Sequence, residues 1–216
     1  MKTLLTFLAL CITLGAQSQK STIRTNIPSA DIFIDGKLVG QGEVGGIKIP
    51  RNECITVQVS ATGYLSQTKE YCKIKGMPQI EKTEYIELGV DDSFEASVQS
   101  DFANNDIIIN PKNKDVEEVW KNAFRLISNY FDAMEVNDTE VYYLRTSWVV
   151  ATFKGYTIRT RVIYRLTREN PLEFSIKVVS ERAEGQASPK DDEKYKPWTR
   201  ILKRYAALIE EVQQRS

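Results

Sequence analysis

The sequence predicts an α+β protein: a small all-β sandwich-type domain followed by an α+β domain in which two helices cover an antiparallel β-meander. From Thr22 to Leu88, short alternating segments are separated by turn residues, and no helical period fits them. Farther along, two segments with apolar residues at a spacing of three and four flank a set of long alternating segments. The 216 residues therefore divide into a signal peptide (1–18), a β domain (19–88), a linker (89–105) and an α+β domain (106–216).

The first 18 residues have the order of a cleavable export signal. Lys2 precedes the apolar run Leu4–Leu14, and small and polar residues follow up to Ser18, after which we expect cleavage; cleavage after Ala16 is the alternative. The run is too short to span a bilayer, and we expect no transmembrane segment. We also expect no lipidation, because Cys11 follows Leu10 rather than a small residue. The sequence thus predicts a periplasmic or extracellular protein.

The composition excludes several classes of function. The chain contains no histidine, which removes Ser-His-Asp and Cys-His nucleophile systems and imidazole zinc sites. Its 29 basic and 29 acidic residues give no net charge that would attract nucleic acid. We therefore expect no catalytic residues, no metal, no cofactor and no nucleic-acid partner.

The β domain reads as a series of short strands joined by turns. The expected strands are STIRTNI, ADIFID, KLVGQ, GGIKIP, CITVQVS, KEYCKIK and TEYIEL. Asp35-Gly36 is a typical hairpin-turn dipeptide. The glycines that follow do not indicate a phosphate-binding loop, because a strand rather than a helix comes after them.

The same segment carries a family resemblance. "IPSADIFIDGKLVGQ", "IPRNECITVQVS" and the later "TGYLS" are similar to the PEGA domain, over about residues 22–88. Matching positions include Asp35-Gly36, Gly40 and Gly63-Tyr64. The resemblance implies a small extracytoplasmic β-sandwich-type module without known catalytic residues.

Cys54 and Cys72 are the two cysteines left after removal of the signal peptide, and an oxidising compartment favours a disulfide between them. If Gly63 is at the centre of the turn, the two cysteines lie nine residues to either side. They then face each other in a symmetric antiparallel hairpin, at a distance that permits the bond. The alternative is a pair of buried free thiols.

The expected α+β domain begins after the polar, aperiodic linker. DIIIN is a candidate strand, and a helix follows in which Asp115 pairs with Glu118 as N-cap and an apolar face runs from Val116 to Tyr130. We then expect strands over residues 134–137, 140–153, 156–168 and 172–182, the last three as a meander. Pro197 is expected to open a final helix.

This order of helix, meander and helix is similar to the helix-grip modules of outer-membrane assembly lipoproteins. The similarity is carried by "RTSW" at Arg145 to Trp148 and by the arginine-rich strand "YTIRTRVIYRL" after it.

Arginines on one expected strand form the first candidate binding site. Arg159, Arg161 and Arg165 share one face of the strand, and Arg145 on the preceding strand extends the set. Such a face can bind phosphate, carboxylate or lipid head groups. The alternative is a solvated face whose arginines pair with Glu173 and Glu181 across the hairpin.

Aromatic residues form the second candidate site. Tyr142 and Trp148 share parity on one expected strand and can line a cleft for a glycan or peptide, or else belong to the core. The acidic pairs at 91–92, 117–118 and 191–192 are better explained by helix capping and solvation than by glycosidase chemistry.

These observations together predict a non-catalytic binding or scaffold protein, accessory to a cell-envelope assembly or surface complex. Its partner is expected to be another envelope protein, or a cell-wall or surface glycan. One alternative is a periplasmic carrier or binding protein for a glycan, lipid or other small ligand. Another is an enzyme or inhibitor acting on glycan or lipid, for which the sequence offers no catalytic constellation.

Overall fold

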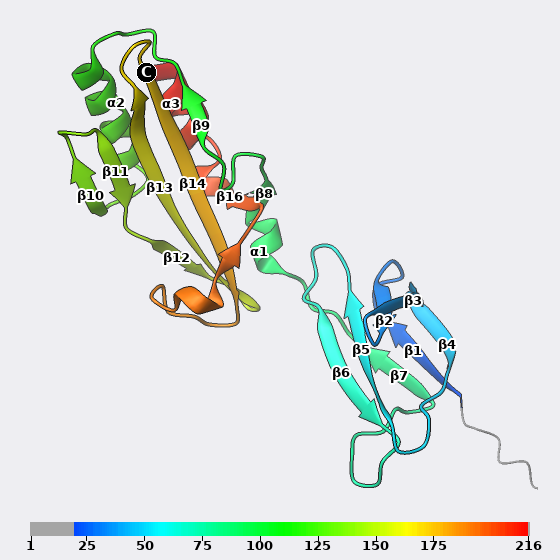
Figure 1. Cartoon of the computed structure of the whole chain (residues 1–216). Helices are drawn as coiled ribbons and strands as arrows, with labels where there is room; N and C mark the ends of the chain where they lie inside the picture. Colours follow the sequence, from blue (N-terminus) through cyan, green and yellow to red (C-terminus); the bar gives the residue numbers. More distant parts are fainter. Residues whose placement is uncertain (1–19, 216) are drawn as a thin grey trace, which may run out of the picture. The chain divides into compact units, whose positions relative to one another are not determined.

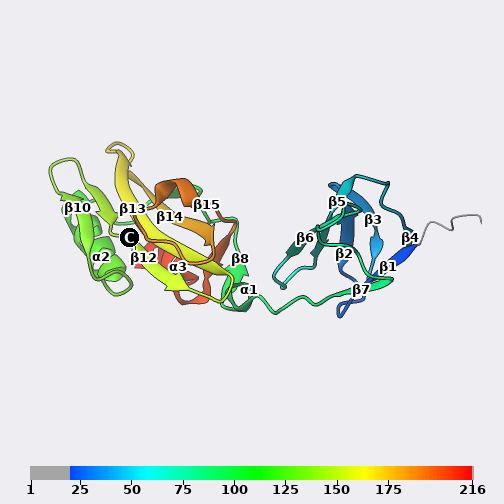
Figure 2. The same cartoon turned by 90° about the horizontal axis from the view of Figure 1, so that it is seen from below.

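The computed structural model describes residues 20–215, so the expected signal peptide lies outside the described residues. The chain is mostly β and divides into two compact units (Figures 1 and 2). The first, which we call the β unit, holds residues 20–62 and Ser66–Leu88. The second, the C-terminal unit, holds Gly63–Leu65 together with the residues from Gly89 onward.

Seven strands build two sheets in the β unit. Their bounds are β1 Ser21–Thr25, β2 Asp31–Ile34, β3 Lys37–Gln41, β4 Glu43–Ile47, β5 Cys54–Ser60, β6 Gln67–Cys72 and β7 Thr83–Ile86. One sheet has the order β4-β1-β7 and the other β3-β2-β5-β6. Every pair is antiparallel except β1 with β7. Alternating apolar residues such as Ile32, Val57 and Val59 are fully buried, as the period of two predicts.

The hairpin predicted at Asp35-Gly36 is present. Both residues have positive φ angles, 50° and 78°, which is the geometry that two-residue hairpins with Asp-Gly adopt. The Asp35 carboxylate also accepts a hydrogen bond of 2.8 Å from the amide of Thr56, which ties the turn to β5. The next strand differs from the expected GGIKIP segment: β4 begins at Glu43, where Val44 pairs with Ile23 of β1.

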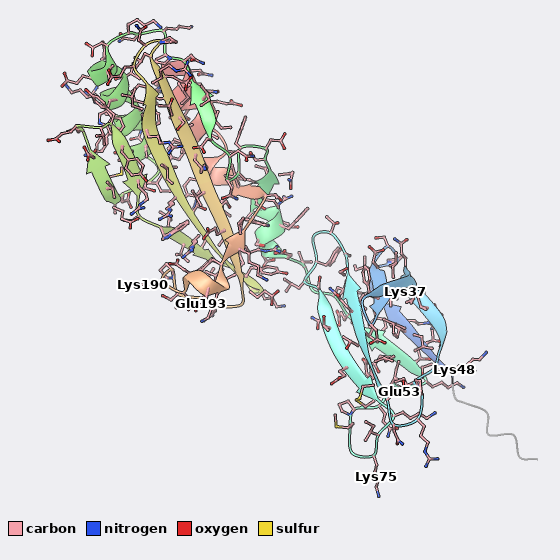
Figure 3. The ribbon with its side chains drawn as sticks, in the orientation of Figure 1. Lys37, Lys48, Glu53, Lys75, Lys190 and Glu193 are labelled. Atoms are coloured by element: carbon pink, nitrogen blue, oxygen red, sulfur yellow. A yellow bond between two sulfur atoms is a disulfide. The ribbon has the colours of Figure 1, made fainter. Side chains whose placement is uncertain are left out.

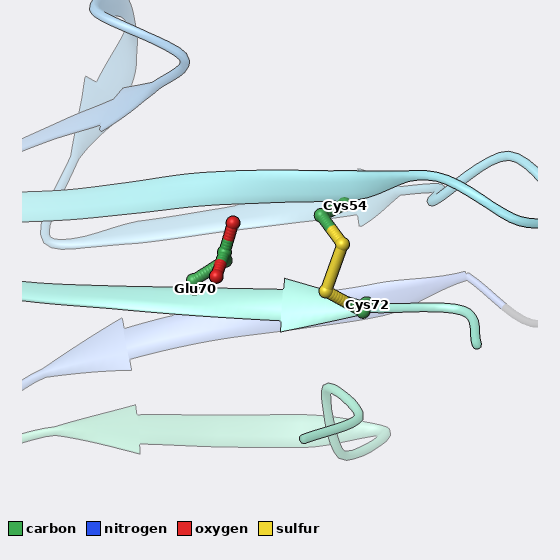
Figure 4. A group of neighbouring side chains, drawn as sticks. All are labelled: Cys54, Glu70 and Cys72. Carbon is green, nitrogen blue, oxygen red and sulfur yellow. A yellow bond between two sulfur atoms is a disulfide. The ribbon is translucent and has the colours of Figure 1, made fainter. Parts of the chain in front are cut away.

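The predicted Cys54–Cys72 disulfide is confirmed. The two residues are directly opposite in the β5–β6 ladder, with Cα atoms 4.0 Å apart (Figure 4). The register runs without interruption from Cys54 to Val59 on β5, so the symmetric hairpin assumed from the sequence is correct. The bond closes the end of this hairpin that lies away from Gly63.

A polar triad joins the two sheets of the β unit. The Tyr71 hydroxyl donates a 2.7 Å hydrogen bond to the Glu84 carboxylate, which also pairs with Lys69 at 3.2 Å. Burial acts to raise the pKa of Glu84, but the hydrogen bonds from Tyr71 and Lys69 outweigh it, so this pKa is lowered. Burial and then Glu84 raise the pKa of Tyr71.

Because the pKa of Glu84 is lower in the folded chain, its stabilising effect is full above the ordinary value of 4.5 and is lost as the pH falls. We expect Tyr71→Phe to lower the free energy of unfolding by about 1–2 kcal/mol at pH 7. The loss should shrink at pH 3.5, where Glu84 is increasingly protonated. Urea unfolding at both pH values measures this, with the exposed Tyr85→Phe as control; an effect that is the same at both pH values would contradict it.

The segment over residues 89–105, which the sequence predicts to be a linker, contains regular secondary structure and clusters with the C-terminal unit. It contains α1 (Asp92–Glu95), whose first amides are capped by Asp91, and β8 (Ser97–Gln99), which pairs with β16 (Arg200–Leu202). The Arg200 guanidinium donates to the backbone oxygens of Phe94 and Ser97. The polar composition reflects these capping and bridging contacts, which a search for apolar periodicity does not detect.

The C-terminal unit contains a seven-stranded sheet. Its strands are β9 Ile107–Ile109, β10 Met134–Asp138, β11 Tyr143–Thr146, β12 Val149–Thr152, β13 Tyr156–Arg168, β14 Glu173–Glu184 and β15 Lys196–Pro197. The main order is β10-β11-β13-β14-β15, with β12 beside β13 and β9 beside β14. The antiparallel meander is as predicted, except that the strand expected over 140–153 is divided into β11 and β12.

Two longer helices lie on one face of this sheet (Figure 1). The first, α2 (Val116–Ser128), begins as predicted after Asp115, whose carboxylate accepts from the amides of Glu117 and Glu118. The second, α3 (Leu208–Arg215), does not begin at Pro197 as expected. Residues 200–202 pair with β8 instead, so strand pairing overrides the helical spacing of the apolar residues there.

Stacked aromatic rings fill the core between helices and sheet. Trp120 of α2 stacks on Tyr164 of β13 with ring centroids 5.6 Å apart, and Tyr164 stacks on Phe174 of β14 at 5.0 Å. Phe131 and Tyr205 stack at 4.9 Å. Trp120 and Trp198 both belong to the buried core.

Candidate functional site

The sheet of the C-terminal unit has a second face, which we call the open face. No α-helix of residues 20–215 covers it (Figure 1). The register brings eleven residues to it: Tyr143, Arg145, Val150, Arg159, Arg161, Ile163, Arg165, Ser175, Lys177, Val179 and Glu181. Glu135 and Trp148 join them through their contacts with these arginines. Ile158, Val162 and Tyr164, on the other side of β13, belong to the core. Arg159, Arg161 and Arg165 of β13 therefore share one face, as the sequence predicts.

Arg159 is the most buried cation of the open face, with 4% of its side chain exposed. It donates to Glu181 at 2.7 Å, to the backbone oxygen of Pro189 at 2.7 Å and to Asp192 at 2.6 Å. Its guanidinium also lies 4.2 Å from the ring of Trp148 and 4.1 Å from that of Tyr195. With all of these partners in place, Arg159 organises the face and is not available to bind an external anion.

Trp148 contacts a second guanidinium, that of Arg161, at 4.1 Å. Tyr195, Arg159, Trp148 and Arg161 thus form a continuous run of alternating rings and cations. Each such contact is worth on the order of 0.5–1 kcal/mol at exposed sites and more where water is excluded. The run fixes Trp148 in one orientation on the surface.

Arg161 and Arg145 share one carboxylate. Glu135 lies 3.0 Å from Arg145 and 3.5 Å from Arg161. It sits at an irregularity in the register between β10 and β11, next to Val136, which pairs with Arg145. Burial and then the neighbouring Arg145 lower the pKa of Arg161. The Nε atom of Arg161 is buried and has no hydrogen-bond partner within the described residues.

A second shared carboxylate lies toward β9. Asp106 pairs with Lys177 at 2.8 Å and with Arg165 at 3.6 Å, and Arg165 also donates to Ser175 at 3.2 Å. The open face outside the Arg159 cluster therefore places four cations (Arg145, Arg161, Arg165 and Lys177) around two carboxylates. These four cations can therefore pair with additional carboxylates.

The cross-hairpin pairing considered from the sequence holds in one case out of two. Glu181 pairs with Arg159, as expected. Glu173 instead lies opposite Arg168 and accepts a hydrogen bond from Thr167. The carboxylates of Glu135 and Asp106 were not anticipated, because they come from β10 and from just before β9, whose pairing partners the sequence did not specify.

Tyr142 and Trp148 do not share a face, contrary to the expectation from parity. Tyr142 packs against the core beside Trp120, with ring centroids 5.6 Å apart, whereas Trp148 stacks on the arginines of the open face. The reason is the interruption at Ser147 and Trp148 between β11 and β12, which shifts the alternation by one residue.

Two clefts border these aromatic residues. One, of about 530 Å³, is lined by Glu117, Trp120, Lys121, Phe124, Arg125, Asn137, Thr139 and Tyr142. The other, of about 590 Å³, we call the Trp148 cleft; it is lined by Asn129, Tyr130, Asp132, Ala133, Ser147, Trp148, Val149, Val150, Arg204 and Tyr205. Both combine aromatic rings with amide and charged groups, which is a lining suited to sugars or peptides.

Cys54, Cys72 and Glu70 form a close group in the β unit (Figure 4). Three such side chains can hold a metal ion when the sulfurs are thiolates. Here the two sulfurs are bonded to each other, so the group is a structural cross-link.

Comparison with known proteins gives no relative for this chain: no family model matches, and neither curated proteins nor solved structures match significantly. No helix within residues 20–215 has the length and apolar character needed to cross a membrane.

Proposed function

We propose that this chain is a non-catalytic binding protein of the cell envelope, and that its C-terminal unit binds another envelope protein through the open face. The observation that supports this proposal is an excess of positive charge on the open face. Four cations (Arg145, Arg161, Arg165 and Lys177) share only two carboxylates, those of Glu135 and Asp106. A partner with surface carboxylates completes these pairs, and charge complementarity of this kind directs specificity and association. The Cys54–Cys72 bond is compatible with an exported protein, as is the PEGA-like pattern of the β unit.

The residue types of the open face also suit a protein partner. Trp and Arg are enriched among the residues that dominate binding energy at interfaces. Trp148 is held in place by two guanidiniums, so little side-chain entropy is lost when a partner covers it. Ile163 and Val179 are half-buried between the charged residues and supply apolar contact area.

Site-specific photo-crosslinking in the exporting cell tests this proposal. A photoreactive residue at Ile163 should give one reproducible protein adduct, whereas the same residue at Glu210, an exposed position of α3, should give none. Arg161→Glu with Lys177→Glu should lower the yield of the Ile163 adduct at least tenfold, because it turns attraction for carboxylates into repulsion. Lys112→Glu with Lys203→Glu, which makes the same charge change at exposed sites off the open face, should leave the yield within twofold.

Equal adducts from Ile163 and Glu210, or equal losses in the two double variants, would contradict the proposal. Circular dichroism of each variant separates loss of binding from loss of folding.

A glycan- or small-ligand-binding role is the second candidate, and the Trp148 cleft favours it. Tyr130 and Trp148 are only partly buried and offer ring surface, and Asn129, Asp132 and Arg204 offer hydrogen bonds beside them. Asp132→Ala with Arg204→Ala changes this cleft without touching the cations of the open face. Loss of glycan binding in that variant, with the Ile163 adduct retained, would assign the cleft its own ligand.

A further inference from the structure

One end of the β unit gathers basic residues that are far apart in the sequence. Backbone hydrogen bonds tie the turn at 50–53 to the start of the β6–β7 loop: Lys73 donates to Glu53 at 2.9 Å and Asn52 to Lys73 at 3.3 Å. Thr22 donates to Lys82 at 3.0 Å at the start of β1. Ser21 pairs with Ile47, which brings the end of β4 to the same place.

We call this region the basic end and define it by eight residues: Lys20, Lys48, Arg51, Lys73, Ile74, Lys75, Met77 and Lys82. All eight are exposed. Lys48 and Lys75 lie toward this end in Figure 3, and Lys37 lies away from it. A shallow cleft of about 90 Å³ lies among these residues and is lined by Ser21, Ile47, Ile49, Cys72, Lys73, Gln79 and Ile80.

The basic side chains of the basic end lie close together and make no ion pairs within the described residues. Six of the basic residues of the β unit lie there, and the acidic residues near them are Glu53, Glu81 and Glu70, whose carboxylate lies beside the Cys54–Cys72 bond. None of the six is within ion-pair distance of a carboxylate in residues 20–215. By contrast, Arg24 and Lys69, elsewhere in the same unit, are paired with Glu43 and Glu84. The basic end therefore presents six free cations on a chain whose total charge is balanced.

Two exposed apolar side chains lie in the middle of this charge. Ile74 and Met77 are 36% and 44% exposed, and the amide of Met77 donates to Ile74 in a tight turn that contains Gly76. Lys73 and Lys75 stand on either side of Ile74 in the sequence. Apolar residues at a loop tip with flanking lysines suit a membrane surface, where cations meet phosphates and the apolar groups enter the acyl boundary.

We propose that the basic end docks the β unit on an anionic phospholipid membrane. A soluble polyanion satisfies the cations but leaves Ile74 and Met77 in water, and an apolar protein patch leaves the six cations without partners. A membrane with anionic head groups accommodates both. This inference concerns a different unit from the open face and does not depend on the function proposed above.

Cosedimentation with vesicles tests it, using the exported chain with its disulfide intact. The chain should bind vesicles of phosphatidylcholine with 30 mol% phosphatidylglycerol at least tenfold more strongly than vesicles of phosphatidylcholine alone, and 0.5 M NaCl should abolish most of the difference. Lys73→Glu with Lys75→Glu should reduce binding at least tenfold. Lys37→Glu with Lys190→Glu, which makes the same charge change at the positions labelled in Figure 3, should stay within twofold of wild type.

A second pair of variants tests whether the apolar side chain of Met77 contributes to membrane binding. Met77→Leu should retain binding and Met77→Asp should lose it, because only the first keeps a side chain that enters the bilayer. Met77 is exposed, so neither change should alter folding, and circular dichroism checks this.

Three outcomes would overturn the inference. The first is equal binding to both kinds of vesicle, and the second is equal loss in the two charge-reversal variants. The third is complete displacement by soluble glycerophosphoglycerol at the concentration of the lipid head group, which would indicate a site for free phosphate instead of a membrane surface.

Discussion

Removing the Cys54–Cys72 bond, by Cys54→Ala with Cys72→Ala, is expected to lower the free energy of unfolding of the β unit by about 3 kcal/mol. The two residues are 18 positions apart, and closing a loop of that size restricts the unfolded chain by about this amount in the chain-entropy model. The effect is large for a unit of this size, because small domains bury a modest share of their surface. Alanine is chosen because Cys72 is buried and a serine hydroxyl there would add a separate cost.

Differential scanning calorimetry with and without reductant measures this effect. Reductant should lower the unfolding temperature of the wild-type β unit to that of the double variant, and it should leave the double variant unchanged. Tryptophan fluorescence supplies the internal control, because Trp120, Trp148 and Trp198 all lie in the C-terminal unit. A change of more than about 0.5 kcal/mol in the fluorescence-detected transition, or no change in the β unit, would contradict the prediction.

Local patterns in the sequence predicted two hairpins of the β unit, because β2 pairs with β3, and β5 with β6, across a single turn. The Asp35-Gly36 turn and the symmetric spacing around Gly63 fix the register of two hairpins, and the register then places Cys54 opposite Cys72. In α2, the spacing of apolar residues determines which face is buried, and the Asp115 cap determines where the helix begins. These features depend on residues a few positions apart, and the sequence displays them directly.

Long-range pairing explains most of what the sequence did not predict. Residues 200–202 have helical spacing, yet they form a strand because β8, about a hundred positions earlier, supplies hydrogen-bond partners. The same contact makes residues 89–105 part of the C-terminal unit. The basic end is a similar case: its six cations are spread from Lys20 to Lys82, and only the folded arrangement of β1, β4 and the β6–β7 loop brings them together.

In the candidate site, some features follow from local alternation and others from contacts between distant residues. Alternation placed Arg159, Arg161 and Arg165 on one face, but it could not show that Arg159 is enclosed, because Asp192, Pro189 and Tyr195 come from a loop about 30 positions later. Alternation wrongly placed Tyr142 and Trp148 on the same face. The interruption between β11 and β12 shifts the alternation by one residue, so every later residue of the strand changes face.

Replacing Arg159 with alanine is expected to lower the free energy of unfolding of the C-terminal unit by about 3 kcal/mol. The change removes the partner of the mostly buried Glu181 carboxylate, and breaking a buried ion pair typically costs about 3–5 kcal/mol. We expect the lower end of that range because Asp192, with 81% of its side chain exposed, is solvated without Arg159. Loss of the contacts with Trp148 and Tyr195 adds to the cost.

Urea unfolding followed by tryptophan fluorescence measures this loss in the C-terminal unit, and Arg165→Ala is the matched control. Arg165 is 48% exposed and 3.6 Å from Asp106, so its removal should cost less than about 1 kcal/mol. Arg159→Lys should recover less than half of the loss, because an ammonium group cannot reproduce the planar fork or the two ring contacts. Arg159→Met with Glu181→Leu should be more stable than Arg159→Ala, since no carboxylate is then left buried without a partner. Equal losses in Arg159→Ala and Arg165→Ala, or full recovery with lysine, would show that Arg159 acts only as one more surface charge and that the fixed orientation of Trp148 has another origin.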